Sequence, residues 1–195
     1  MAGRVLLAAA ISAVLMFLWA FVFWGPVINA TARLTSPLPA AAELDLVAPL
    51  RASNMPDGMY VYPGPLADMG DEAATKAWTE KIEAGPVFHL AYHQQGVSPM
   101  EPMMFVQGLV HNFAIALLSA SLLALVVDSL PRYAGRVGLL LLLTLIAAIW
   151  TNVASVIWWF HTPKYCAGQM AYEIVAGLLM AVVTAGLVKP KPILM

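Results

Sequence analysis

The sequence predicts a membrane protein of mainly α-helical fold, with four transmembrane helices and a small extracytoplasmic α/β insertion between helices 1 and 2. Of the 195 residues, 61% are hydrophobic and 11% are charged, whereas soluble domains carry about 25% charged residues. The charged residues also leave four long runs that hold at most one of them. These runs are Val5–Ala32, Pro102–Val127, Val137–Pro163 and Gln169–Val188.

Each run is long enough to cross a bilayer, because about 20 apolar residues in a helix span the roughly 30 Å hydrocarbon core. We therefore expect the chain to contact a lipid bilayer through four helices. The predicted boundaries of the spans are 5–28, 103–127, 137–160 and 169–188.

Basic residues predict the orientation, since cytoplasmic loops carry an excess of Lys and Arg. Arg4 precedes the first span, Arg132 and Arg136 separate the second from the third, and Lys189 and Lys191 follow the fourth. If the helices alternate in direction, all of these lie on one side. Both termini are expected in the cytoplasm and residues 29–101 outside it, as in a multi-pass protein of a bacterial inner membrane.

The segment 29–101 reads as a small water-exposed unit divided by Pro and Gly. Ala40–Ser53 looks helical with an interruption at Pro49, and Met59–Tyr62 has the composition of a strand. Asp71–Ala84 is predicted to be a helix, with Asp71 as its N-cap and Gly85-Pro86 as its stop. Val87–His93 alternates as a second strand does.

Polar residues inside the spans are the best indications of function, because burying them in lipid is costly. Several lie one to two turns from the predicted outer end of spans 2, 3 and 4, where they form a shared polar layer. One interpretation of this layer is a functional site, in which His111 and Glu173 act as metal ligands, as a proton-handling pair or as anchors for a quinone or lipid head group, with Trp150 and Tyr172 as walls. The alternative is a hydrogen-bonded cluster that only fixes helix packing. The candidate ligand-binding residues are Gln107, His111, Asn112, Thr151, Asn152, Tyr172 and Glu173.

A second candidate site is the pair His89 and His93. Four residues apart, they share a face, but only a helix brings their Cβ atoms to about 6 Å, close enough to chelate one metal. In the predicted strand they lie about 13 Å apart. The alternative interpretation is therefore two ordinary surface histidines.

Small residues at four-residue steps predict how the spans pack, since they let helix backbones approach closely within lipid. They continue the face of Asn112 on span 2 and the face of Glu173 on span 4, and Ala148 links Thr144 to Asn152 on span 3. We expect spans 2 to 4 to form a tight bundle with span 1 packed outside. The small residues on spans 2 and 4 are Ala116, Ala120, Ala124, Gly177, Ala181 and Ala185.

Several classes of function have no support in the sequence. A net charge of −1 gives no reason to expect nucleic acid as a partner. One cysteine, Cys166, excludes a disulfide framework within the chain. Motifs for phosphate binding, zinc proteolysis, serine hydrolysis and covalent haem attachment are absent. The sequence therefore leans away from an enzyme and names no cofactor.

Four segments make the chain resemble a family of small, uncharacterised bacterial four-helix inner-membrane proteins with an extracytoplasmic loop domain after the first span. They are the aromatic run Phe17–Trp24, the strand Gly58–Pro63, the start of the third span Tyr133–Gly138 and the pair Trp158-Trp159. The resemblance implies topology and a bacterial origin. It implies no activity and no site.

Two functions follow as expectations, and an enzyme or transporter comes third after them. One is a non-catalytic accessory or assembly subunit of a larger membrane complex, with other membrane-protein subunits as partners. The other is a membrane-embedded binding protein that holds a quinone, lipid, haem or metal at the polar layer. A pocket among the polar residues favours binding, a filled interface favours a structural role, and a broad apolar patch on the outer segment favours the subunit.

Overall fold

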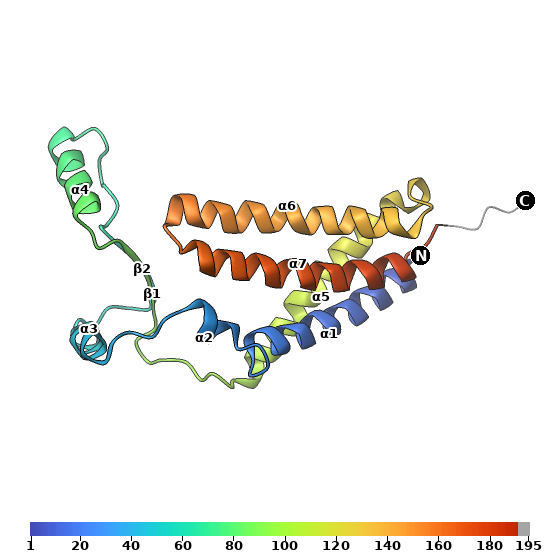
Figure 1. The fold of residues 1–195 in the computed structure, drawn as a ribbon, viewed down its shortest axis with the longest axis horizontal. Coiled ribbons are helices and arrows are strands. Elements are labelled where there is room, and N and C mark those ends of the chain that lie inside the picture. Colours follow the sequence, from blue (N-terminus) through green and yellow to red (C-terminus); the bar gives the residue numbers. More distant parts are fainter. Residues whose placement is uncertain (191–195) are drawn as a thin grey trace, which may run out of the picture. The chain divides into compact units, whose positions relative to one another are not determined.

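A computed structural model describes residues 1–190 of the chain, so Lys191, one of the basic residues used to predict orientation, lies outside the described residues. Four helices are long and apolar enough to cross a membrane (Figure 1). They are α1 (Ala2–Trp24), α5 (Pro102–Val126), which the short 3₁₀ helix η1 (Val127–Ser129) extends, α6 (Tyr133–Trp159) and α7 (Pro163–Leu187).

The predicted spans were bounded by charged residues, but some helices begin or end at prolines instead. α1 ends at Trp24 instead of residue 28 because Gly25 and Pro26 follow, and the residue before a proline is disfavoured in the helical region. α7 begins at Pro163, six residues before the predicted 169, since proline suits the first turn of a helix. α6 begins at Tyr133 instead of residue 137.

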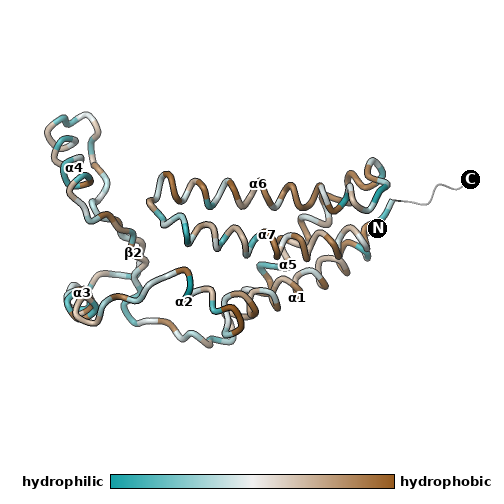
Figure 2. The backbone as a smooth tube through the Cα atoms, viewed as in Figure 1, coloured by the Kyte–Doolittle hydropathy of each residue, from teal (hydrophilic) through white to brown (hydrophobic). Residues whose placement is uncertain are grey.

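The chain divides into two compact units. One holds residues 1–36, 100–157 and the chain from His161 on, and the other holds residues 37–99 with 158–160. Figure 2 shows the long helices of the first unit as mainly hydrophobic and α4 of the second as largely hydrophilic.

In the first unit, α1 packs against both α5 and α7. The prediction that the first span lies outside a bundle of the other three is therefore wrong. The reason is a stripe of small residues on α1 itself, which lets α5 and α7 approach its backbone. Ala8, Ala9 and Ser12 on this stripe have no exposed surface, and the Ser12 hydroxyl lies 3.4 Å from that of Thr184.

The predicted small faces of α5 and α7 are buried as expected. Ala116, Ala120, Ala181 and Ala185 have no exposed surface. One hydrophobic core joins residues of α1, α5, α6 and α7 at the end of the bundle that contains the N-terminus and η1: Val5, Ala8, Ala120, Leu123, Val127, Leu140, Ala181 and Val188.

α6 is the peripheral helix, and polar contacts hold it to α7. The Tyr133 hydroxyl donates to the Val182 carbonyl at 3.1 Å, and Arg136 Nε donates to the Ala185 carbonyl at 3.1 Å. Arg136 Nη1 also donates to the carbonyls of Leu130 and Pro131 at 3.0 and 2.8 Å. The buried Arg136 guanidinium thus satisfies backbone carbonyls where η1 turns into α6.

The first unit also contains a short helix that the sequence did not predict, α2 (Ala30–Leu34). It packs against α7, and the side chain of Leu34 lies where a Cβ on Gly168 would stand. α2 therefore closes one side of the α7 N-terminal half.

The second unit contains α3 (Ala40–Ala52), β1 (Gly58–Tyr62), α4 (Glu72–Ala84) and β2 (Phe88–Tyr92). Both predicted strands are confirmed, and they pair antiparallel with Tyr60 opposite Leu90. α4 is confirmed with its cap, since the Asp71 carboxylate accepts from the Ala74 N–H at 3.0 Å. The helix ends at Gly85, whose φ is 61°.

One expectation for this unit is corrected. α3 continues through Pro49 as one helix, so the proline does not interrupt it. The predicted order of strand, helix and strand is present as β1, α4 and β2, although α4 buries none of its residues. Within residues 37–99, the buried positions are Pro63 and Tyr92, whose hydroxyl donates to the Leu50 carbonyl at 3.2 Å.

Candidate functional site

A cavity of 410 Å³ lies between α5, α6 and α7. Each of these helices contributes several residues to its lining, and Met16 of α1 contributes one side. Ligand pockets commonly measure about 300–1,000 Å³ and combine a mostly apolar wall with a few polar groups. The remaining lining residues are His111, Asn112, Ile115, Ser119, Leu140, Leu143, Thr144, Ala147, Thr151, Tyr172, Glu173, Ala176, Gly177 and Met180.

The lining is polar at one end and largely apolar at the other. On α5 it runs from His111 to Ser119, about 12 Å along the helix axis, and on α6 from Thr151 to Leu140, about 16 Å. The cavity therefore extends over about half of the roughly 30 Å hydrocarbon core. Its polar end is formed by His111, Asn112, Thr151, Tyr172 and Glu173, the residues nearest the predicted outer ends of their helices.

Glu173 is held in place at the polar end. Asn152 Nδ2 donates to Glu173 Oε2 at 2.9 Å and to the carbonyl of Ala148 at 3.0 Å. The neighbouring Tyr172 is anchored through its backbone, because Trp19 Nε1 of α1 donates to its carbonyl at 3.1 Å. Among the described side chains, no hydrogen bond reaches Glu173 Oε1.

A second hollow lies on the other side of Tyr172 and Glu173. Its wall includes Trp24 of α1, Thr31 of α2, Thr35, and Tyr165 and Gln169 of α7. Gln169 Nε2 donates to the Tyr165 hydroxyl at 3.3 Å. Glu173 thus borders two spaces: the cavity between α5, α6 and α7, and a more polar hollow beside α2.

The structure brings most of the predicted polar layer together. Five of the seven predicted residues line the cavity, and Asn152 contacts Glu173. Gln107 does not line the cavity and its side chain is exposed. Trp150 is not a wall, because it is 81% exposed and points away from the lining.

Sequence reasoning missed the deeper part of the cavity. Ser119, Thr144 and Gly177 line it, and Met16 and Met180 close it. Ser119 lies two turns below Asn112 on α5, and Thr144 lies two turns below Asn152 on α6. This spacing would have indicated that the polar face continues inward.

The predicted pair His89 and His93 lies in the second unit. β2 is a strand, so the two side chains lack the close spacing that a helix would give them. Throughout residues 1–190, no group of three or more His, Cys, Asp or Glu side chains is placed to hold a metal ion. The structure therefore adds no support for a metal at these histidines.

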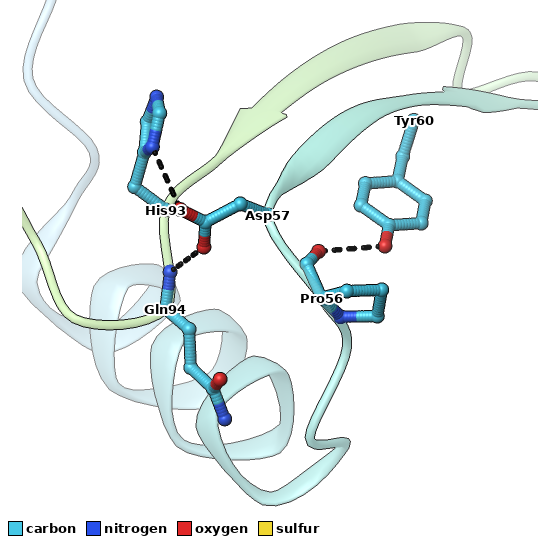
Figure 3. A network of polar contacts seen from close by, with 5 residues as sticks. All are labelled: Pro56, Asp57, Tyr60, His93 and Gln94. Carbon is cyan, nitrogen blue, oxygen red and sulfur yellow. Dashed lines mark hydrogen bonds and ion pairs between the residues drawn. The ribbon is translucent and has the colours of Figure 1, made fainter.

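His93 has a different partner, shown in Figure 3. Its Nδ1 lies 3.3 Å from Asp57 Oδ2, and Asp57 Oδ1 accepts from the backbone N–H of Gln94 at 2.8 Å. The hydrogen bond from Gln94, followed by that from His93, lowers the pKa of Asp57. These contacts link the start of β1 to the end of β2, and they are a structural feature of this exposed two-stranded sheet.

Comparison with known proteins adds no function. No family model, no curated protein and no solved structure matches the chain. The resemblance to small bacterial four-helix membrane proteins stays a prediction, and the function is argued from the cavity.

Proposed function

We propose that this protein is a membrane-embedded binding protein that holds an amphipathic, lipid-soluble ligand in the cavity between α5, α6 and α7. The observation that carries this proposal is the cavity itself, 410 Å³ in volume, with hydrogen-bonding side chains at one end. A polar layer that served only helix packing would be filled by its own side chains, as closely packed interiors are. Here the polar residues of three helices face a space instead.

The cavity size narrows the ligand. A water occupies about 30 Å³ in the liquid, so 410 Å³ corresponds to about 14 water volumes. This space accommodates a lipid head group with the first part of its tail, or a quinone ring. A metal is disfavoured because His111 and Glu173 supply two ligands, whereas protein sites for zinc use three or four.

The ligand is expected to enter from the bilayer, between α5 and α6. Four lining residues are exposed, and they lie on these two helices: His111 and Ile115 on α5, Ala147 and Thr151 on α6. Figure 1 shows α5 and α6 meeting near η1 and separating toward their other ends. An opening of this kind would admit the tail of a lipid without passing it through water.

Filling the cavity tests this proposal. Ala147→Trp places a large side chain into the space, and Ile146→Trp on the neighbouring outward position, which is 55% exposed, is the matched control. We expect lipid extracts of the purified wild type and of Ile146→Trp to contain one small amphipathic molecule at near one per chain, measured by mass spectrometry. Ala147→Trp should lose it. Equal lipid content in all three proteins would refute the proposal.

We further infer that both termini lie in the cytoplasm and residues 29–101 outside it, in a bacterial inner membrane. Arg4, Arg132 and Lys189 support this orientation, because they flank the helix ends where Val5, Val127 and Val188 share one core. In a Cys166→Ser background, Ser53→Cys should react with a membrane-impermeant maleimide on intact cells, and Ser129→Cys should react only after lysis. The reverse pattern would overturn the orientation.

A second candidate function is that of a subunit in a larger membrane complex, and the second unit supports it. Leu44, Met59 and Met69 in this unit are 74%, 71% and 85% exposed. A segment with so little buried surface gains little stability from its own core. Native mass spectrometry of the gently extracted protein tests this candidate: a bare chain or a simple multiple would argue against it, and a larger assembly would support it.

A further inference from the structure

We infer that the cavity selects ligands whose head group donates hydrogen bonds and carries no negative charge, with Glu173 as the residue that recognises the donor. This inference rests on the proposed function and names the chemical class of its ligand. The class includes hydroxylated lipids such as monoacylglycerols and excludes lipids that end in a phosphate.

The first observation behind this inference is the set of hydrogen-bond acceptors at the polar end of the cavity. Asn152 occupies Glu173 Oε2 at 2.9 Å, while Oε1 accepts no hydrogen bond from the described residues. Asn112 and Thr151, whose side chains carry an amide and a hydroxyl, belong to the same lining. A head group with several hydroxyls can donate to the carboxylate and accept from these neighbours, and hydrogen bonds to a charged group are the stronger kind.

The second observation is the distribution of charged residues around the cavity. Its lining includes one acidic residue, Glu173, and no Lys or Arg. The nearest lysine along α7, Lys164, precedes Glu173 by nine residues, about 13 Å along the helix. Arg136 is committed to the carbonyls of Leu130, Pro131 and Ala185 at the other end of α6. A phosphate would thus be placed beside the Glu173 carboxylate with neither Lys nor Arg in the lining to pair with it, and this repulsion costs much more in an apolar medium than in water.

The third observation is the apolar end of the cavity, because it determines the orientation of the ligand. Leu140, Leu143 and Met180 line the part of the cavity farthest from Glu173. An acyl chain placed there extends the head group toward Glu173 and His111. The ligand is therefore held head outward, with its tail following α5 and α6 toward the middle of the bilayer.

Two probes that share one tail and differ by a phosphate test the inference. Monodecanoylglycerol and decanoyl lysophosphatidic acid are titrated separately into the full chain in detergent, and bound fractions are read by native mass spectrometry. We expect monodecanoylglycerol to bind at least tenfold more tightly, a difference of about 1.4 kcal/mol. Equal binding, or tighter binding of the phosphate, would overturn the inference.

The variant Glu173→Gln tests whether the carboxylate of Glu173 causes the selectivity between the two probes. The amide retains an oxygen that can accept from Asn152 and removes the charge, so the ratio between the two probes should fall toward one. Glu101→Gln, the same change at an exposed position before α5, should leave the ratio at its wild-type value. An unchanged ratio in Glu173→Gln would mean that Glu173 does not select the ligand. Should that variant fail to fold, the wild-type ratio decides alone.

A third variant separates this inference from the proposed function. If Ala147→Trp abolishes binding of both probes and the wild-type ratio is near one, the cavity binds ligands but does not select them by charge, and the inference alone fails. If Ala147→Trp binds both probes as the wild type does, the cavity is not the binding site, and the proposed function fails with it.

Discussion

At the scale of single residues, the hydrogen bond between Asn152 and Glu173 is the main polar link across the α6–α7 interface at the cavity. Asn152 is 5% exposed, and its amide bridges the Ala148 carbonyl of its own helix and the Glu173 carboxylate of α7. The bond thus has two consequences. It links the peripheral α6 to α7, and it occupies one carboxylate oxygen while leaving the other without a hydrogen bond from the described residues.

A double-mutant cycle between Asn152→Ala and Glu173→Ala measures this bond. Hydrogen bonds between membrane helices contribute about 0.6 kcal/mol on average and up to about 1.7 kcal/mol. We expect a coupling free energy within that range from reversible unfolding in detergent. Ser155→Ala serves as control, because Ser155 bonds the carbonyl of Thr151 in its own helix. It should not couple to Glu173→Ala, and a zero value for Asn152 as well would show that the bond does not form.

Asp57 is a pH-sensitive residue of the second unit. The Gln94 N–H and His93 bond its carboxylate and lower its pKa below the usual value near 3.9. Because the folded pKa is the lower one, the stabilisation is present above about pH 4 and is lost as the pH falls through the folded pKa. We expect the Gln94 amide proton resonance to titrate with a midpoint below 3.9. In Asp57→Asn this titration should vanish; a wild-type midpoint at or above the usual value would contradict the contact.

At the scale of elements, Gly177 is the position on α7 against which the Thr144 side chain of α6 packs. A Cβ at this position would overlap the side chain of Thr144, whereas a Cβ at Gly186, nine residues later on the same helix, would meet nothing within 4 Å. The absence of a side chain at Gly177 therefore leaves room for Thr144, next to the cavity that both residues line.

Two glycine-to-alanine variants test this packing. Gly186→Ala should stabilise the protein by up to about 1 kcal/mol, since alanine favours helix over glycine. Gly177→Ala should lose that gain and cost about 1–3 kcal/mol from overpacking against Thr144. Thermal unfolding in detergent gives both values. If Gly177→Ala were as stable as Gly186→Ala, the packing of the Thr144 side chain against Gly177 would be wrong.

The helices and strands themselves were largely predictable, because the signals that define them come from residues close together in the sequence. Four apolar runs predicted four helices, and Asp71 with Gly85 bounded α4 correctly, because caps act on neighbouring residues. The place of α1 in the bundle was not predicted. Ala8, Ala9 and Ser12 carry the same small-residue signal as α5 and α7, but which stripe meets which depends on contacts between distant parts of the chain.

At the scale of the whole molecule, the candidate site arises because α6 stands at the edge of a compact trio of helices. α1 packs closely against α5 and α7 through alanines, while α6 is bonded to α7 through the longer side chains of Tyr133, Arg136 and Asn152. The sequence indicated that polar residues lie at one depth on three helices. It could not indicate a cavity, since an empty volume depends on how far α6 stands from α7 along its whole length.

The most direct test of the account is to map where a lipid-like ligand binds. Monodecanoylglycerol with a diazirine in its acyl chain is irradiated with the protein in nanodiscs, and labelled peptides are identified by mass spectrometry. The account predicts labels concentrated at Ile115–Ser119 and Thr144–Ala147, lost in Ala147→Trp and retained in Ile146→Trp. Labels spread evenly over exposed apolar positions such as Leu18 and Leu125, which are 54% and 83% exposed, and unaffected by Ala147→Trp, would contradict it.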